Sequence, residues 1–136
     1  MKIVVIDGQG GSLGRALVEG IKGLDGCEIY AVGTNSIATS AMLKSGADFG
    51  ATGENPVVVN CRDADIIAGP IGIIAADSLL GEITEKMAAA VAKSGAVKVL
   101  IPVSRCSVTV AGVQDMPMGE LIKIAVEKIK ILAQNG

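Results

Sequence analysis

A glycine-rich turn near the start of the chain contains the residues best suited to binding chemistry. It lies between the apolar run Lys2–Asp7 and a helical pattern that begins at Arg15. Backbone N–H groups at such a turn, with the positive end of a helix dipole, favour a bound anion, and glycines let a phosphate approach closely. We therefore predict that a phosphate or nucleotide binds here; the alternative is that the glycines only allow close helix–strand packing. The predicted binding residues are Gly8, Gln9, Gly10, Gly11, Ser12, Leu13 and Gly14.

The spacing of these glycines departs from both standard phosphate-binding motifs. Counted forward from Gly8, the dinucleotide fingerprint GxGxxG needs its third glycine where Leu13 stands. Counted back from Gly14, it needs its first glycine where Gln9 stands. The turn is thus one residue longer than the standard one. It is not a Walker A loop either, because Arg15 follows Gly14 in place of lysine.

The end of the second expected strand, residues 28–32, indicates the choice of cofactor. NAD sites usually have Asp or Glu there, which binds the ribose hydroxyls. This chain has Gly33 followed by the neutral residues Thr34, Asn35 and Ser36. A small, donor-rich turn suits a 2′-phosphate, so NADP is favoured over NAD as the cofactor. Alternatively, these three residues only cap the following helix.

Three further polar residues follow later expected strands. Arg105 comes after the strand 96–103 and is expected to bind a substrate or another anion. Asp77 and Ser78 lie in an apolar, irregular segment, 71–82, and are expected near the same edge of the sheet. No base or paired carboxylate identifies a catalytic residue, so catalytic roles stay unassigned. An enzyme would need Asp77, Glu54 or Cys106 as its acid, although Cys106 is better explained as a packed thiol.

The composition excludes several classes of protein. The chain has 136 residues, a net charge of −2 and 50% hydrophobic residues, which predicts one folded domain over residues 1–136 and excludes disorder. The mild acidity argues against a nucleic-acid partner. The absence of histidine excludes histidine-based catalysis and histidine metal ligands. Three cysteines without a CxxC pair predict neither a disulfide framework nor a metal site.

No membrane partner or secretion signal is expected from the sequence. The longest uncharged apolar run, residues 66–76, is interrupted by Gly69 and Pro70. A membrane helix needs about 20 apolar residues. The apolar run at the start is too short for a signal peptide. We therefore expect a cytoplasmic protein with reduced thiols.

The elements that must position these residues alternate between strands and helices. Helical patterns cover residues 15–22, a stretch from the caps at 34–36 to 45, residues 84–93 and residues 117–133. Strand patterns cover residues 2–7, 28–32, 57–59, 65–68, 96–103 and 107–111. This alternation predicts a three-layer αβα, Rossmann-like, doubly wound and mostly parallel sheet. Ligands of such sheets bind at the carboxyl ends of the strands, where the strand order reverses.

The last helix is more apolar than one sheet face requires. Its apolar stripe, together with the apolar segment 71–80, leaves surplus hydrophobic surface. We interpret this surplus as the interface of a homo-oligomer. The residues of the stripe are Leu121, Ile122, Ile124, Ala125, Val126, Ile129, Ile131 and Leu132.

Several runs of the sequence together resemble a known family. VIDGQGGSLG, AVGTNSIATSAMLKSGAD, ATGENPVVVN, ADIIAGPIGII and LIPVSRC are similar to a family of short bacterial proteins described as a domain of unknown function. The resemblance covers essentially the whole chain and implies a stand-alone cytoplasmic protein without assigned residue roles. Residues 2–35 also resemble, more loosely, the start of NAD(P)-binding domains.

Three functions remain open on these observations. The first is a nucleotide or dinucleotide binder that acts as a sensor or regulatory module. The second is a small NADP-dependent reductase, or a transferase acting on a phosphorylated metabolite, with Arg105 binding the substrate. The third is a non-enzymatic oligomeric scaffold whose glycines serve packing alone.

Overall fold

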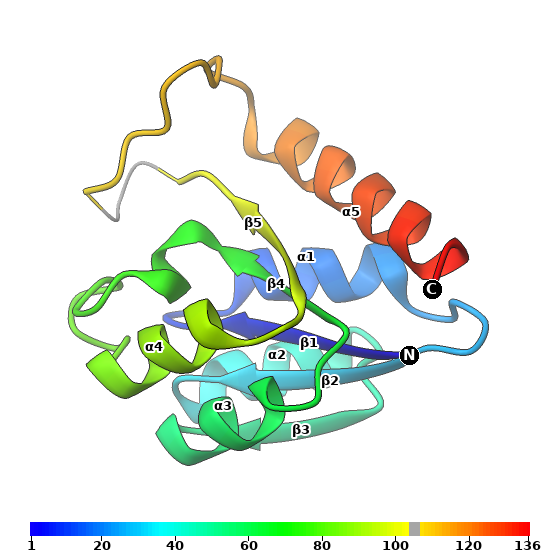
Figure 1. Cartoon of the computed structure of the whole chain (residues 1–136), viewed down its shortest axis with the longest axis horizontal. Coiled ribbons are helices and arrows are strands. Elements are labelled where there is room, and N and C mark those ends of the chain that lie inside the picture. Colours follow the sequence, from blue (N-terminus) through cyan, green and yellow to red (C-terminus); the bar gives the residue numbers. More distant parts are fainter. Residues whose placement is uncertain (104–106) are drawn as a thin grey trace.

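A five-stranded parallel sheet forms the centre of the molecule (Figure 1). The computed structural model describes residues 1–103 and 107–136. The strand order is β3-β2-β1-β4-β5, so the order reverses between β1 and β4. This confirms the expected doubly wound sheet. The strands are β1 (Lys2–Asp7), β2 (Glu28–Gly33), β3 (Phe49–Thr52), β4 (Ile66–Pro70) and β5 (Val97–Ile101).

Helices cover both faces of this sheet and complete three layers. One face packs against α1, α2 and α5, and the other against α3 and α4. None of the helices in the described ranges is long and apolar enough to cross a membrane. The helices are α1 (Ser12–Ile21), α2 (Ser36–Lys44), α3 (Glu54–Cys61), α4 (Glu85–Lys93) and α5 (Met118–Gln134), with a 3₁₀ turn at Ile71–Ile74.

The central strand β1 is apolar throughout because both of its faces are buried. Ile3 and Val5 face the layer of α1 and α5, and Val4 and Ile6 face the layer of α3 and α4. All four side chains have no exposed surface. A continuous β-branched run is typical of a parallel strand covered on both sides, which is why the sequence indicates β1 so clearly.

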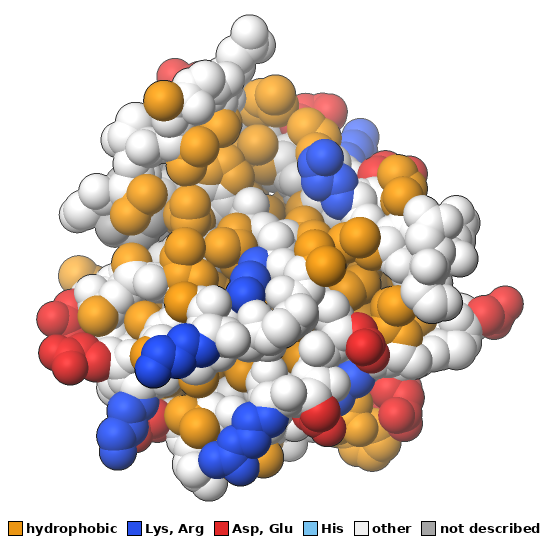
Figure 2. Space-filling model, in the orientation of Figure 1, with side chains coloured by type: hydrophobic (Ala, Val, Ile, Leu, Met, Phe, Trp, Pro, Cys, Tyr) orange, Lys and Arg blue, Asp and Glu red, His pale blue; other side chains and the backbone are white. Residues whose placement is uncertain are grey.

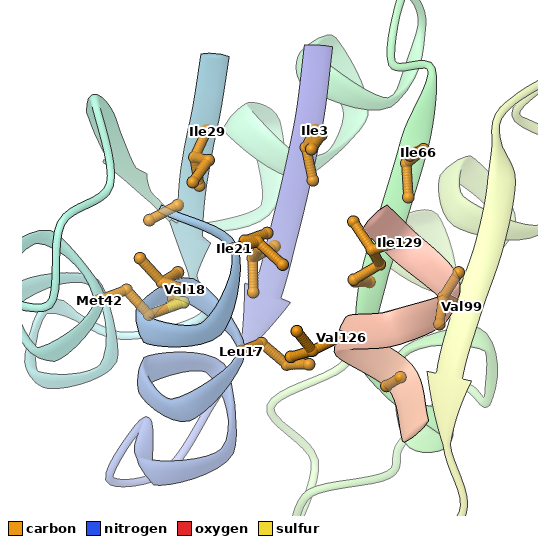
Figure 3. Packing of buried hydrophobic residues seen from close by; sticks show 14 of the residues in the cluster. Ile3, Leu17, Val18, Ile21, Ile29, Met42, Ile66, Val99, Val126 and Ile129 are labelled. Atoms are coloured by element: carbon orange, nitrogen blue, oxygen red, sulfur yellow. The ribbon is translucent and has the colours of Figure 1, made fainter. Parts of the chain in front are cut away.

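Two helices far apart in the chain share one layer. Figure 3 shows Leu17 and Ile21 of α1 lying beside Val126 and Ile129 of α5 against the sheet. Gly20 permits this contact, because a Cβ there would lie only 2.5 Å from Cγ2 of Val126. Three of the eight residues in the apolar stripe of the last helix, Ala125, Val126 and Ile129, are therefore buried in the core of the monomer, and three more pack against it.

The expected strand at residues 57–59 is wrong, because these valines lie in α3. The third strand is instead Phe49–Thr52, in a stretch for which the sequence predicts neither a helix nor a strand. Pro56 occupies the first turn of α3, where its missing N–H costs no hydrogen bond. Val57 is fully buried against the sheet. Burial of one helical face thus outweighs the β-branched preference for a strand.

The expected strand at residues 107–111 is also wrong. This part of the chain is irregular, and each residue from Ser107 to Glu120 is exposed. Alternating valines at 108 and 110 imitate a half-buried strand. A strand also needs a neighbouring ladder, and the described structure pairs β5 only with β4.

We expect α5 to contribute strongly to stability through its buried face. Ile129→Ala should lower the free energy of unfolding by about 2–5 kcal/mol, because it removes a fully buried side chain. Ile131→Ala, on the same helix but 54% exposed, should change it by no more than about 0.5 kcal/mol. Urea denaturation measures both variants. Equal small losses would show that α5 is not docked on the sheet.

Candidate functional site

The carboxylate of Asp7 organises the glycine-rich turn at the end of β1. Its Oδ1 accepts the N–H of Gly8 at 2.8 Å, and its Oδ2 accepts the N–H of Gly14 at 2.7 Å. The turn therefore curls around this carboxylate, which is only 5% exposed. Burial raises the pKa of Asp7 above its ordinary value, although the hydrogen bonds from Gly14 and Gly8 oppose that rise.

Three of the four glycines in the turn are required by the fold. A Cβ at Gly8 would lie 2.6 Å from Oγ1 of Thr34, and one at Gly14 would lie 2.6 Å from Sδ of Met42. Gly11 has a φ of 75°, in the left-handed region that favours glycine. It forms the N-cap of α1, and Ser12 is the first residue of the helix. Close packing thus accounts for these three positions.

Gly10 differs, because the fold gives no reason for a glycine there. It is exposed, its φ is not positive, and a Cβ would meet no heavy atom within 4 Å. Within residues 1–103 and 107–136, neither its N–H nor that of Ser12 has a hydrogen-bond acceptor. Both groups lie at the start of α1, at the positive end of its dipole.

A cavity of about 720 Å³ opens beside this turn. It lies at the carboxyl ends of β1, β4 and β5, where the strand order reverses, as expected for a doubly wound sheet. Its far wall comes from the exposed segment 108–118 and the first turn of α5. The lining on the sheet side is Asp7, residues 8–13, Pro70, Leu79, Pro102 and Val103.

The described lining of this cavity contains two ionisable side chains, Asp7 and Asp115. The expected anion-binding residue Arg105 and the neighbouring Cys106 lie outside the described residues. No cluster of three or more possible metal ligands occurs in the part of the chain that the structure describes.

Glu82 joins the glycine-rich turn to the end of β2. Its Oε1 accepts the N–H of Gln9 at 2.9 Å, the hydroxyl of Thr34 at 2.5 Å and Nδ2 of Asn35 at 2.9 Å. Burial by itself raises the pKa of Glu82, but these three hydrogen bonds outweigh it, and the pKa lies below its ordinary value of 4.5. Sequence reasoning missed Glu82, because no local pattern shows that the end of the irregular segment 71–82 lies against the glycine-rich turn and the end of β2.

Thr34, Asn35 and Ser36 lie beside the turn but do not line the cavity. Asn35 caps α2 by accepting the N–H of Ala38 at 2.9 Å, which confirms the capping interpretation for this residue. The donors of Thr34 and Asn35 are taken by Glu82. A 2′-phosphate on this turn would meet that carboxylate, so these residues give NADP no advantage over NAD.

Asp77 and Ser78 lie in the turn after the 3₁₀ segment and do not line the cavity. Ser78 is buried and donates its hydroxyl to the carbonyl of Gly72. Asp77 is exposed with a φ of 67°, and its N–H donates to the carbonyl of Ile83 at 2.7 Å. These hydrogen bonds stabilise the turn that positions Glu82. Glu54 is in the first turn of α3 and is not in the lining either.

The lowered pKa of Glu82 predicts a specific pH dependence of stability. Because its pKa is lower in the folded than in the unfolded chain, Glu82 stabilises the fold above its ordinary pKa. This contribution is lost as the pH falls through the lowered value. Glu82→Gln should therefore cost more stability at about pH 6 than at about pH 3 in urea titrations. Glu127→Gln, on the exposed side of α5, is the control. A pH-independent cost at position 82 would contradict the hydrogen-bonded carboxylate.

Comparisons with known proteins place this chain in a family. Among solved structures, it is similar to a dodecameric FMN-dependent UbiX-like decarboxylase from Escherichia coli O157:H7. The two share 19% identity with a TM-score of 0.47, over 95% of this chain and 76% of that one. No curated protein matches the chain. Residues 2–134 match the family model described as Domain of unknown function (DUF3842). The chain therefore belongs to this DUF3842 family, in agreement with the resemblance found in its sequence.

Proposed function

We propose that this protein binds a nucleotide or dinucleotide and acts as a sensor or regulatory module. The phosphate lies on residues 10–13, at the start of α1. The observation that carries this proposal is the pair of unpaired N–H groups, of Gly10 and Ser12, at the edge of the 720 Å³ cavity. Small-molecule sites typically have about 300–1,000 Å³.

The position of Gly10 supports a ligand rather than packing. Replacing a glycine by a residue that fits the same backbone usually stabilises a protein by about 0.4–1 kcal/mol, since the unfolded chain loses entropy. Gly10 has the space for a side chain and no positive φ. A phosphate that closely approaches the backbone of Gly10 would explain why this position has no side chain.

The charge of the site needs a cation to accompany a phosphate. Asp7 already accepts two N–H groups of the turn, which offsets part of its charge. Arg105 follows β5 in the sequence and is the proposed cation on sequence grounds. NADP is the ligand that the sequence favours, and it belongs to the proposed class together with NAD, FMN and ATP. The described cavity holds no acid–base pair, so we propose binding rather than a reaction.

Substitution of Gly10 tests the phosphate position. A ligand at 100 times its Kd adds about 2.7 kcal/mol of stability and raises the unfolding midpoint by several degrees. We expect such a rise with at least one of NADP, NAD, FMN, ATP, S-adenosylmethionine or phosphate. Gly10→Val should leave the midpoint of the free protein within about 2 °C and abolish the rise, because its methyl groups occupy the phosphate position. Calorimetry or an external dye serves, because the chain has no Trp.

Gly95→Val is the matched control for this experiment. Gly95 also has open space for a Cβ, but it precedes β5, at the opposite edge of the sheet. The Gly95→Val variant should bind the ligand as the wild type does. If Gly10→Val binds the ligand as tightly as the wild type, the phosphate does not lie on residues 10–13. No rise with any of these ligands would contradict nucleotide binding and favour the scaffold function.

A second function, self-association, is favoured by the exposed apolar side chains near the cavity. Figure 2 shows apolar side chains gathered where the segment 107–118, β5 and α5 meet. We propose that a second copy of this chain covers them, alone or in a larger homo-oligomer. The exposed members are Val108, Val110, Val113, Met116, Met118 and Ile124.

A charge in this patch tests the homo-oligomer. Val113 is 46% exposed in the patch, and Val59 is 42% exposed on the opposite layer, in α3. Val113→Glu should convert the oligomer to a monomer in sedimentation velocity, because burying an unpaired carboxylate is costly. Val59→Glu should leave the mass unchanged. A wild-type mass equal to one chain at every concentration would contradict self-association.

A further inference from the structure

We propose that Glu82 binds the ribose of the nucleotide and discriminates against a 2′-phosphate. This assignment rests on the proposed nucleotide binding and specifies its ligand: a nucleotide with a free 2′-hydroxyl. It names a specificity-determining residue, Glu82, to which the sequence analysis gives no role.

The position of Glu82 in space carries the first step. In doubly wound dinucleotide sites, an acidic side chain at the end of the second strand accepts a hydrogen bond from the ribose 2′-hydroxyl. In this chain β2 ends at Gly33, and no acid follows it directly. Glu82 reaches the same place from the segment after β4, hydrogen-bonded to Thr34 and Asn35. The acid that is missing from the end of β2 is thus supplied from elsewhere in the chain.

The carboxylate also touches the turn that is proposed to hold the phosphate. Its Oε1 accepts the N–H of Gln9 at 2.9 Å and would lie 2.9 Å from a Cβ at Gly8. Glu82 therefore lies between the glycine-rich turn and the end of β2. Glu82 does not itself line the cavity, but it contacts Gln9, the residue before Gly10. A ribose is joined directly to its 5′-phosphate, so the proposal places the sugar of a nucleotide bound on residues 10–13 beside this carboxylate.

One oxygen of Glu82 remains available to a ligand. The three hydrogen bonds of this side chain all go to Oε1, and no described residue donates to Oε2. An ionised carboxylate only accepts hydrogen bonds, and the lowered pKa keeps Glu82 ionised at neutral pH. A ribose hydroxyl can donate to Oε2, whereas a 2′-phosphate brings a like charge to the same place. Repulsion of that kind is a common means of rejecting a wrong ligand.

The surroundings hold the carboxylate in place before a ligand arrives. The side chain of Asn35 is fixed because it also caps α2, and the N–H of Thr34 donates to the carbonyl of Asp7 at 3.0 Å. A group held in its bound position loses little entropy on binding. A residue that only joins the two loops would make the same contacts. Measurements of ligand preference and of stability separate this structural role from ribose binding.

Isothermal titration with NAD and NADP makes this separation. The wild type should bind NAD at least about tenfold more tightly than NADP, which corresponds to about 1.4 kcal/mol. Glu82→Gln keeps the size and an acceptor oxygen but removes the charge, so the preference should fall to about threefold or less. Glu127→Gln, with the same charge change on α5, should keep the wild-type ratio.

A measurement on the unaltered protein makes the test independent of how well Glu82→Gln folds. Adenosine 5′-phosphate should bind more tightly than its 2′-deoxy analogue, because the analogue lacks the donor for Oε2. A preference for NADP, or no loss with the deoxy analogue, would overturn the assignment. So would a Glu82→Gln variant that loses stability but keeps the NAD preference, since Glu82 would then be a clamp alone.

The failure of this assignment is distinguishable from the failure of the proposed function. If FMN or phosphate binds and Gly10→Val abolishes that binding, but no adenine nucleotide binds, the phosphate site stands and the role of Glu82 is wrong. If none of these ligands binds the wild type, both proposals are wrong.

Discussion

The hydrogen bonds between Asp7 and the turn that follows it determine the geometry at the carboxyl end of β1. A carboxylate that is nearly buried is costly unless its oxygens are satisfied. The N–H groups of Gly8 and Gly14 satisfy them, so the turn must wrap around the end of β1. Position 14 must then be glycine, since a Cβ there would lie 2.8 Å from that of Asp7. The start of α1, and with it the open N–H groups, follows from this one arrangement.

A second carboxylate limits what the turn can offer a ligand. Glu82 takes the N–H of Gln9, as Asp7 takes those of Gly8 and Gly14. The two carboxylates therefore take three N–H groups of the turn, that of Gly11 donates to the carbonyl of Gly8, and those of Gly10 and Ser12 stay open within the described residues. An anion bound here would receive fewer backbone donors than a loop without such carboxylates provides. A partner cation thus becomes a requirement of the nucleotide proposal, which makes Arg105 important to it.

The fold was predictable where burial and local conformational preference favour the same element. Strand β1 is buried on both faces, and its unbroken apolar run shows this without knowledge of its neighbours. Residues 57–59 were not predictable in the same way, because β-branched side chains favour a strand while burial of Val57 and the position of Pro56 favour a helix. The segment 107–111 has the alternation of a strand but no ladder to join. Local preference is decisive only where long-range packing agrees with it.

The candidate site divides along the same line. The turn 8–14 is contiguous, so its glycines and the helix after it are visible in the sequence. The far wall of the cavity and Glu82 come from distant segments that only the fold brings to β1 and β2. The neutral turn at Thr34 would indicate NADP only if no charged residue from another part of the chain lay beside it. In the folded protein the carboxylate of Glu82 lies beside this turn. An acid absent from the end of β2 can still be supplied at the same point of the fold by a distant segment, and the proposed preference for a free 2′-hydroxyl follows from the charge at that point.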